Sequence, residues 1–299
     1  MKLSKTRKGE LYMFGETILA GSFTVTTVFA YRFLQPLTVL FWSTLIAALF
    51  FSVLLILKKK WRELLEKEAW KYILGATFIV GIIYFSIFFL GLKHTTAGDA
   101  AIIAETELWS SFVLLGLILK KEKYTSSAIV GASLMFVGVL AVVFSGSFSI
   151  NIGNLIILFG AMIVPVGNYF AQKALEAVSS ITLMFVRSAI SSVFFFLIML
   201  STNASFRGQE FQKVLPVLIF SGLFIFGVSK IFSMEAIKRI SIAKSRSIGT
   251  LVPVFALAYA FLFLGEIPTI WQILGLVPIM IGITLITKNK FLDEPPSID

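Results

Sequence analysis

Apolar residues dominate this chain in long runs that short polar segments separate. Each run approaches the ~20 residues that a helix needs to cross a lipid bilayer. Most charged residues fall between the runs, as expected where lipid surrounds the helices. The pattern therefore predicts an all-α integral membrane protein with ten transmembrane helices, at residues 11–29, 37–57, 71–92, 98–119, 126–145, 152–172, 179–200, 214–236, 243–264 and 269–287.

One short motif occurs twice, at the start of the fifth and tenth expected helices. It consists of a glutamate, a threonine three residues later and two glycines seven residues apart. Seven residues make almost two helical turns, so the two glycines share a face that a neighbouring backbone can approach closely. The threonine is placed to cap the helix that follows. We therefore expect a structural role for Glu122, Thr125, Gly131 and Gly138 in the first copy, and for Glu266, Thr269, Gly275 and Gly282 in the second.

The motif belongs to a longer internal duplication. A constant offset of about 145 residues also aligns Phe14-Gly15 with Phe159-Gly160, which indicates two homologous halves. Each half holds an odd number of helices, so the second half enters the membrane from the opposite side, and such inverted repeats are typical of carriers. The expected organisation is a tail at 1–10, a first five-helix repeat at 11–145, a second, inverted five-helix repeat at 152–288 and a tail at 289–299.

Lys and Arg residues predict the orientation. Most of them fall in the segments on one side of the membrane, while the other side holds only Arg32, Lys93, Arg207 and Lys213. Because positive charge marks the cytoplasmic side, both termini are expected in the cytoplasm, with the protein in a prokaryotic plasma (inner) membrane. The segment 58–71, rich in Lys and Arg and carrying two tryptophans, is expected to be a connector at the membrane surface.

Composition excludes several classes of function. The chain has 299 residues, of which 58% are apolar and 14% charged, whereas soluble domains have about 45–50% and 25%. The sequence has no cysteine and a single histidine, His94, so neither a metal site nor a cofactor is expected. The net charge of +10 reflects topology, and no nucleic-acid partner is expected. No nucleotide-binding loop and no Ser/His/Asp set is present, so the chain is expected to be neither an enzyme nor an ATP-driven pump.

Charged residues inside the expected helices are the first candidates for a site. Each costs at least ~2.5–3.5 kcal/mol at the bilayer centre, so such residues normally face a protein interior or a wet cavity. A cavity between oppositely charged halves suits a zwitterion; the alternative is that these charges pair and merely lock one conformation. The carboxylates of the first half are Glu16, Glu105 and Glu107, and the cations of the second half are Arg187, Lys230 and Arg246.

Two further predictions concern these charges and their neighbours. Glu105 and Glu107 lie about 200° apart around a helix, so only one can point straight into a cavity, and Glu107 is the preferred one. Glu16 or Glu107 is expected to carry a coupling proton, unless the two only form ion pairs. The remaining candidates for lining the cavity are polar or aromatic, although packing alone also explains aromatic residues: Trp42, Tyr84, Trp109, Asn168 and Gln172.

Together, the two halves, the Phe-Gly pairs, Leu264-Gly265-Glu266 and the repeated Glu–Thr–Gly–Gly motif resemble the EamA-type branch of the drug/metabolite transporter superfamily. The resemblance implies ten helices as two EamA-like repeats, cytoplasmic termini and transport of small organic metabolites through a central cavity. The first half departs from the family pattern in two places. It has Glu105–Leu108 where a proline is usual, as at Pro253, and Trp42 where an arginine is usual, as at Arg187. Typical substrates of the family are therefore not transferred to this chain.

The sequence favours a secondary transporter that exports a small polar or zwitterionic metabolite, such as an amino acid, by alternating access. An exporter of organic cations or drugs that exchanges them for protons is the alternative within transport, and a channel or a non-transporting membrane scaffold is the alternative outside it. The expected partners are the small-molecule substrate, the lipid bilayer and a proton as coupling ion. The sequence does not predict an oligomeric state.

Overall fold

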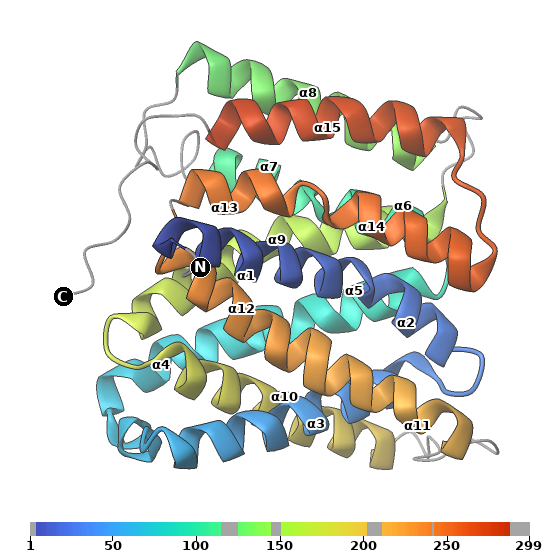
Figure 1. Ribbon diagram of the computed structural model, residues 1–299. Coiled ribbons are helices and arrows are strands. Elements are labelled where there is room, and N and C mark those ends of the chain that lie inside the picture. Colours follow the sequence, from blue (N-terminus) through green and yellow to red (C-terminus); the bar gives the residue numbers. More distant parts are fainter. Residues whose placement is uncertain (1–3, 115–124, 145–150, 202–210, 241, 288–299) are drawn as a thin grey trace.

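The computed structural model describes residues 4–114, 125–144, 151–201, 211–240 and 242–287, and helices are the only regular secondary structure over these residues. Its long helices lie roughly parallel or antiparallel to one another (Figure 1). Helices α8 (Ser126–Phe144) and α15 (Ile270–Thr287) lie side by side at one edge of the bundle. Helices α3 (Pro36–Leu57) and α10 (Ser180–Ser201) pack at the opposite edge, and α1 (Lys5–Gly21) and α9 (Ile152–Leu175) run between these pairs.

Within the described residues, eight helical stretches are long and apolar enough to cross a membrane. A further apolar helix at Ile270–Ile286 is shorter. The fourth expected span, 98–119, is divided into two short helices, and residues 115–119 lie outside the described residues. The expected total of ten spans therefore stays a prediction. The eight candidate spans are Lys5–Ala30, Pro36–Leu57, Lys67–Leu92, Ser126–Phe144, Ile152–Leu175, Ser180–Ser201, Phe211–Ile237 and Lys244–Leu264.

Several spans consist of consecutive helical segments. The span that begins at Lys5 contains α1 and α2 (Phe23–Ala30). Two others contain a central π-helical stretch, a rare conformation that often occurs at functional sites. One is made of α4 (Lys67–Ala76), η2 (Thr77–Tyr84) and α5 (Phe85–Leu92). The other is made of α11 (Phe211–Ile219), η4 (Phe220–Val228) and α12 (Ser229–Ile237).

Two spans are interrupted at equivalent places. Helix α6 (Ala97–Ala104) stops one residue before α7 (Thr106–Phe112), and α13 (Ile242–Gly249) stops shortly before α14 (Val252–Tyr259), which continues into η5 (Ala260–Leu264). Pro253, which has no backbone N–H to donate, accounts for the second interruption. The first occurs without a proline, at Glu105, where the backbone forms tight turns such as Glu105 N to Ile102 O at 3.2 Å.

The duplicated glycines form the contact between α8 and α15. A Cβ atom added to Gly138 would lie 2.5 Å from Gly275 O, and one added to Gly131 would lie 2.6 Å from Gly282 O. This order of contacts means that the two helices run antiparallel. Each helix begins with a threonine cap, because Thr125 Oγ1 accepts the N–H of Ala128 and Thr269 Oγ1 accepts the N–H of Gln272. Glu122 lies outside the described residues.

Glycines also join the first helix of each half to the other half. A Cβ atom on Gly15 would lie 3.0 Å from the ring of Phe232, and one on Gly160 would lie 3.0 Å from Ile87. Thus α1 packs on α12 from the second half, and α9 packs on α5 from the first half. The two Phe-Gly motifs allow equivalent close approaches between the halves.

The connector η1 (Trp61–Leu65), between α3 and α4, is tied to the start of α10 by Glu63. One carboxylate oxygen of Glu63 accepts hydrogen bonds from Ser179 N at 2.7 Å and from Ser179 Oγ and Thr182 Oγ1 at 2.6 Å. The other oxygen pairs with Lys60 Nζ at 2.8 Å. Burial raises the pKa of Glu63, but the hydrogen bonds from Lys60, Ser179 and Thr182 outweigh it and lower this pKa from 4.5 to about 2.

We expect Glu63→Gln to lower the free energy of unfolding by ~1 kcal/mol near neutral pH, because glutamine keeps an acceptor oxygen but loses the charge that strengthens these hydrogen bonds and the ion pair with Lys60. Because the folded state lowers the pKa of Glu63, its contribution is fully present above the unfolded value of 4.5 and is lost as the pH falls towards about 2. Thermal unfolding should therefore separate the two proteins near neutral pH and not in strong acid. Glu66→Gln in the same connector is the control, and a constant difference at all pH values would contradict this role.

Candidate functional site

Charged side chains from both halves lie near one another between α1, α12, α13 and the break that follows α6. Glu16 on α1 is 8% exposed, and its Oε1 atom lies 4.0 Å from Lys230 Nζ on α12. The close approach at Gly15 brings these two helices together. Arg246 on α13 attracts both Glu16 and Glu105 electrostatically. We name these groups, with two more residues described next, the central charge cluster: Glu16, Glu105, Glu107, Asn168, Lys230 and Arg246.

Glu107 is held from α9. Asn168 Nδ2 donates a hydrogen bond to Glu107 Oε1 at 2.8 Å. Glu105, at the interruption between α6 and α7, repels Glu107 and Glu16 and is attracted by Arg246. Tyr84, at the end of the π-helical segment η2, is close enough to interact electrostatically with both Glu105 and Glu107. A break in one helix and a π-helical turn in another therefore border the cluster.

The charges of the cluster differ in accessibility. Glu16 is buried, whereas the side chain of Lys230 is 39% exposed and Arg246 is exposed. Cations accessible to a ligand can bind a carboxylate or a phosphate, and the carboxylates beside them can bind an ammonium group. The arrangement thus presents both signs of charge within one region between the halves.

The structure does not bring every candidate into the cluster. On α10, Arg187 Nη2 donates to Met184 Sδ at 3.0 Å, and the stem of Arg187 packs over Gly81. On α3, Trp42 packs against Phe211, with ring centroids 5.2 Å apart. Gln172 is exposed near the end of α9.

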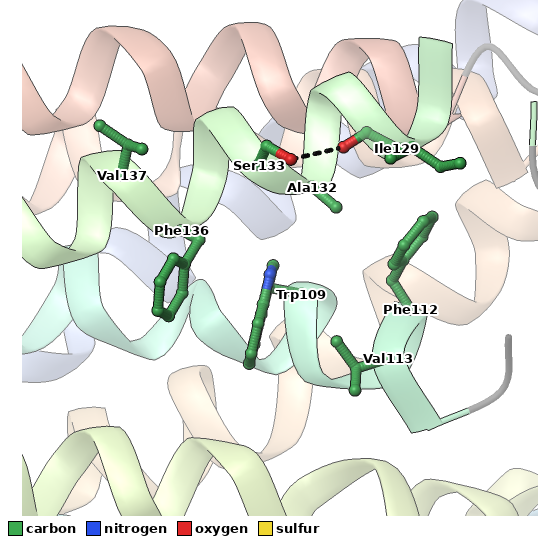
Figure 2. A pocket seen from close by; sticks show the side chains of 8 residues that line it. All are labelled: Trp109, Phe112, Val113, Ile129, Ala132, Ser133, Phe136 and Val137. Atoms are coloured by element: carbon green, nitrogen blue, oxygen red, sulfur yellow. Dashed lines mark hydrogen bonds between the residues drawn. The ribbon is translucent and has the colours of Figure 1, made fainter. Parts of the chain in front are cut away.

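Trp109 lines a separate, apolar groove between α7 and α8. Its ring stacks on Phe136 with centroids 5.0 Å apart, and Figure 2 shows both rings beside the groove, whose volume is about 310 Å³. The groove offers a ligand almost no polar group, because the hydroxyl of Ser133 is bonded to Ile129 O in its own helix. Trp109 follows Glu107 by two residues and so leaves α7 in a nearly opposite direction. We therefore place it outside the central charge cluster.

The sequence analysis missed a second polar network, at the end of the bundle where α6, α9 and α15 begin. Asp99 is 9% exposed and accepts hydrogen bonds from Gln272 Nε2 at 2.7 Å and Asn154 Nδ2 at 3.2 Å. Glu266 accepts the N–H groups of Ala97 and Gly98 at the start of α6. The spacing of Thr96 and Asp99, a threonine followed three residues later by an acid at a helix start, is the sequence signal that identifies this position.

An equivalent contact lies at the other end of the bundle. Lys244 is separated from Asp99 by the repeat offset, and it forms an ion pair with Glu10 on α1. Asp99 therefore joins α6 to α9, and Lys244 joins α13 to α1, at opposite ends of the molecule. Hydrogen bonds and an ion pair thus hold the two halves together on both sides of the central charge cluster.

The described residues contain no group of three or more His, Asp or Glu side chains arranged to hold a metal ion.

Comparison with known proteins gives the family directly. The model of the EamA-like transporter family matches this chain twice, over residues 7–144 and 151–288. The chain belongs to the EamA-like transporter family. It is therefore a multi-pass membrane protein with a tandem EamA repeat.

Individual relatives of this EamA-like protein are also named as transporters. The transporter YyaM of Bacillus subtilis is 26% identical over 286 residues, which cover 91% of each chain. A transporter of Archaeoglobus fulgidus is 23% identical over 88% of this chain and 92% of its own. The triose phosphate/phosphate translocator of non-green plastids in Brassica oleracea is 26% identical over 121 residues, which cover 40% of this chain and 28% of the translocator.

A solved crystal structure shares the fold of this EamA-like protein. It superposes with a TM-score of 0.67 over 93% of this chain and 95% of its own, at 12% sequence identity. At that identity the likeness concerns the fold alone.

Proposed function

We propose that this EamA-like protein is a secondary carrier that exports a small zwitterionic metabolite, such as an amino acid, by alternating access. The central charge cluster carries the proposal, because carboxylates of the first half and cations of the second half meet there. The ammonium group of the substrate would lie towards Glu105 and Glu107, and its carboxylate towards Lys230 and Arg246. Asn168 would hold Glu107 in position.

The proposed mechanism needs two halves with opposite orientation. The antiparallel glycine contacts of α8 and α15 support this orientation. Gly131 contacts Gly282, and the residues equivalent to these two in the other repeat are Gly275 and Gly138, which also contact each other. If the two halves exchanged their conformations, the cluster would open to one side of the membrane and then to the other. Opening towards one side would break the Asp99 network, and opening towards the other side would break the Lys244–Glu10 pair. With both termini in the cytoplasm, the Lys244–Glu10 pair closes the cytoplasmic end.

A coupling proton is the second part of the proposal. Glu107 and Glu16 are the candidate carriers, because both lie in the cluster and neither forms a short ion pair among the described residues. Protonating a carboxylate when the substrate leaves would avoid exposing an unpaired charge to the membrane interior. Export of the substrate would then be exchanged for protons.

A phosphorylated organic anion is the second candidate substrate. Two plastid relatives are named triose phosphate/phosphate translocator and phosphoenolpyruvate/phosphate translocator, each 26% identical over 121 residues, which cover 40% of this chain. Lys230 and Arg246 would bind such an anion. The three carboxylates around them favour a zwitterion instead, and the presence of these two cations in the cluster disfavours an exporter of organic cations.

A screen of ligands against the purified protein tests this assignment. We expect an amino acid to raise the melting temperature, because a ligand at about 100 times its Kd stabilises the folded state by about 2.7 kcal/mol. Lys230→Met should weaken the apparent affinity at least ~10-fold, since it removes a charge-assisted hydrogen bond. Lys93→Met, at an exposed helix end, is the matched control. Stabilisation by amines alone or by phosphorylated acids alone would contradict the proposal. Equal stabilisation of Lys230→Met and Lys93→Met by the amino acid would also contradict it.

A further inference from the structure

The connector between α3 and α4 presents a strongly basic surface. It directly follows one candidate membrane span and leads into the next. Its basic side chains are all exposed, and exposed apolar side chains stand among them: Leu57 is 69% exposed, Trp61 50% and Leu65 71%. We name this surface the basic connector and define it by Lys58, Lys59, Lys60, Arg62, Lys67 and Lys71.

Carboxylates neutralise this surface only in part, because the connector holds three of them, Glu63, Glu66 and Glu68, against six cations and so keeps a net positive charge. Glu63 turns one oxygen towards Ser179 and Thr182 at the start of α10, and its other oxygen pairs with Lys60. Within the described residues, no ion pair joins a carboxylate to Lys58, Lys59 or Arg62. The guanidinium of Arg62 lies over the ring of Trp61, 5.3 Å from its centroid. A cation and an aromatic ring are thus presented together, as is typical of side chains at a membrane surface.

The backbone conformation at Lys59 is unfavourable for a lysine. Its φ angle is 55°, in the left-handed region that glycine adopts most easily. Lys60 N bonds to Leu55 O at 2.9 Å, which closes the turn that ends α3 and which usually has glycine at the left-handed position. Three consecutive lysines therefore follow the span, where local backbone preference favours a glycine at the middle one.

We propose that the basic connector binds the phosphate headgroups of anionic phospholipids, while Trp61 and Leu65 enter the interfacial layer beside them. Clusters of four or more Lys and Arg directly beside a membrane span are attracted to anionic lipids. Exposed tryptophan and leucine side chains add the apolar contact that a free anion could not use. Through Glu63, the bound lipid would stabilise the start of α10 as well as the connector. This binding does not depend on which solute the protein carries.

The melting temperature of the purified protein in mixed micelles tests this proposal. Phosphatidylglycerol should raise it more than phosphatidylcholine does, and inorganic phosphate at the same concentration should not. The variant Lys58→Gln/Lys59→Gln/Arg62→Gln should lower the apparent affinity for phosphatidylglycerol about 100-fold, because it removes three cations. The variant Arg32→Gln/Lys93→Gln/Lys213→Gln loses the same charge at the opposite end of the bundle and should keep the full response.

Lys59→Gly supplies a second variant that relieves backbone strain. In phosphatidylcholine it should melt at or above the temperature of the unchanged protein, and its response to phosphatidylglycerol should be smaller. An undiminished response in both connector variants would overturn the proposal. An equal response to inorganic phosphate would also overturn it, because the surface would then bind free anions and not lipid.

Discussion

Replacing Glu107 with glutamine will reduce substrate transport roughly 10- to 100-fold, the loss expected when a charge-assisted interaction worth about 1.5–3 kcal/mol is removed. Glutamine keeps the size of the side chain and an oxygen that can still accept the hydrogen bond from Asn168. The variant therefore removes the charge and leaves the contact between α7 and α9 in place. Initial rates of uptake into proteoliposomes, measured at several pH values, give the result.

Two control variants distinguish the loss of the Glu107 charge from a change in the fold. Glu68→Gln changes an exposed carboxylate of α4 outside the cluster and should transport normally. Asn168→Leu removes the hydrogen-bond donor but keeps the carboxylate, so its effect and that of Glu107→Gln should not be additive in the double variant. If Glu107 carries the proton, the pH dependence of transport should disappear with the glutamine. Unchanged uptake with an unchanged pH profile would remove Glu107 from the mechanism.

The second large effect is on stability, at the contact between α8 and α15. Gly138→Ala should lower the free energy of unfolding by about 1–3 kcal/mol, because the added methyl group overpacks a tight interface. Its Cβ atom would lie 2.5 Å from Gly275 O and 2.7 Å from Ile279 Cγ1. Gly275→Ala should have a similar effect, since its Cβ atom would lie 2.6 Å from Gly138 O. Thermal unfolding in detergent measures the stability of both variants.

Gly249 provides the matched control for this substitution. A Cβ atom there meets only Met13 Cε, at 3.6 Å. Gly249→Ala should be neutral, or stabilise the protein by up to about 1 kcal/mol, because alanine is the better helix former. If the alanine variants at positions 138, 249 and 275 melted at the same temperature, close packing of the two glycine stripes would not hold the helices together.

Much of the fold could be predicted from the repeated glycines and the apolar runs. The EamA family was identified from motifs in both halves, and the family match confirms it. The equal spacing of Gly131 with Gly138 and of Gly275 with Gly282 predicted close backbone approach, and these four residues contact one another in pairs. Spacing alone did not reveal that the two copies are each other's partners, since that depends on how the halves pack.

The charges of the site could be predicted less completely. A charged side chain inside a membrane is costly in free energy, and this indicated that five residues need polar surroundings: Glu16, Glu105, Glu107, Lys230 and Arg246. The same argument marked Arg187, but its guanidinium donates a hydrogen bond to the sulfur of Met184. Depth along a helix does not fix the direction in which a side chain leaves it, and this direction separates Arg187 from the cluster.

Other features have no strong signal in the sequence. The interruption at Glu105 has no proline, so only the equivalence with the Pro253 region pointed to a special position there. Asp99 lies close to the expected start of a span, where an acidic residue is ordinary, and its partners Asn154 and Gln272 come from distant segments. Contacts between segments far apart in the chain depend on packing, which local patterns do not contain.

Counterflow in proteoliposomes tests the central claim most directly. Vesicles that contain the protein are loaded with the amino acid that stabilises it best, and uptake of the labelled amino acid is then followed. A carrier whose halves enclose one site should show transient accumulation that saturates with substrate and is lost in Lys230→Met. Uptake that rises linearly with concentration, without accumulation and equally in the variant, would contradict the account.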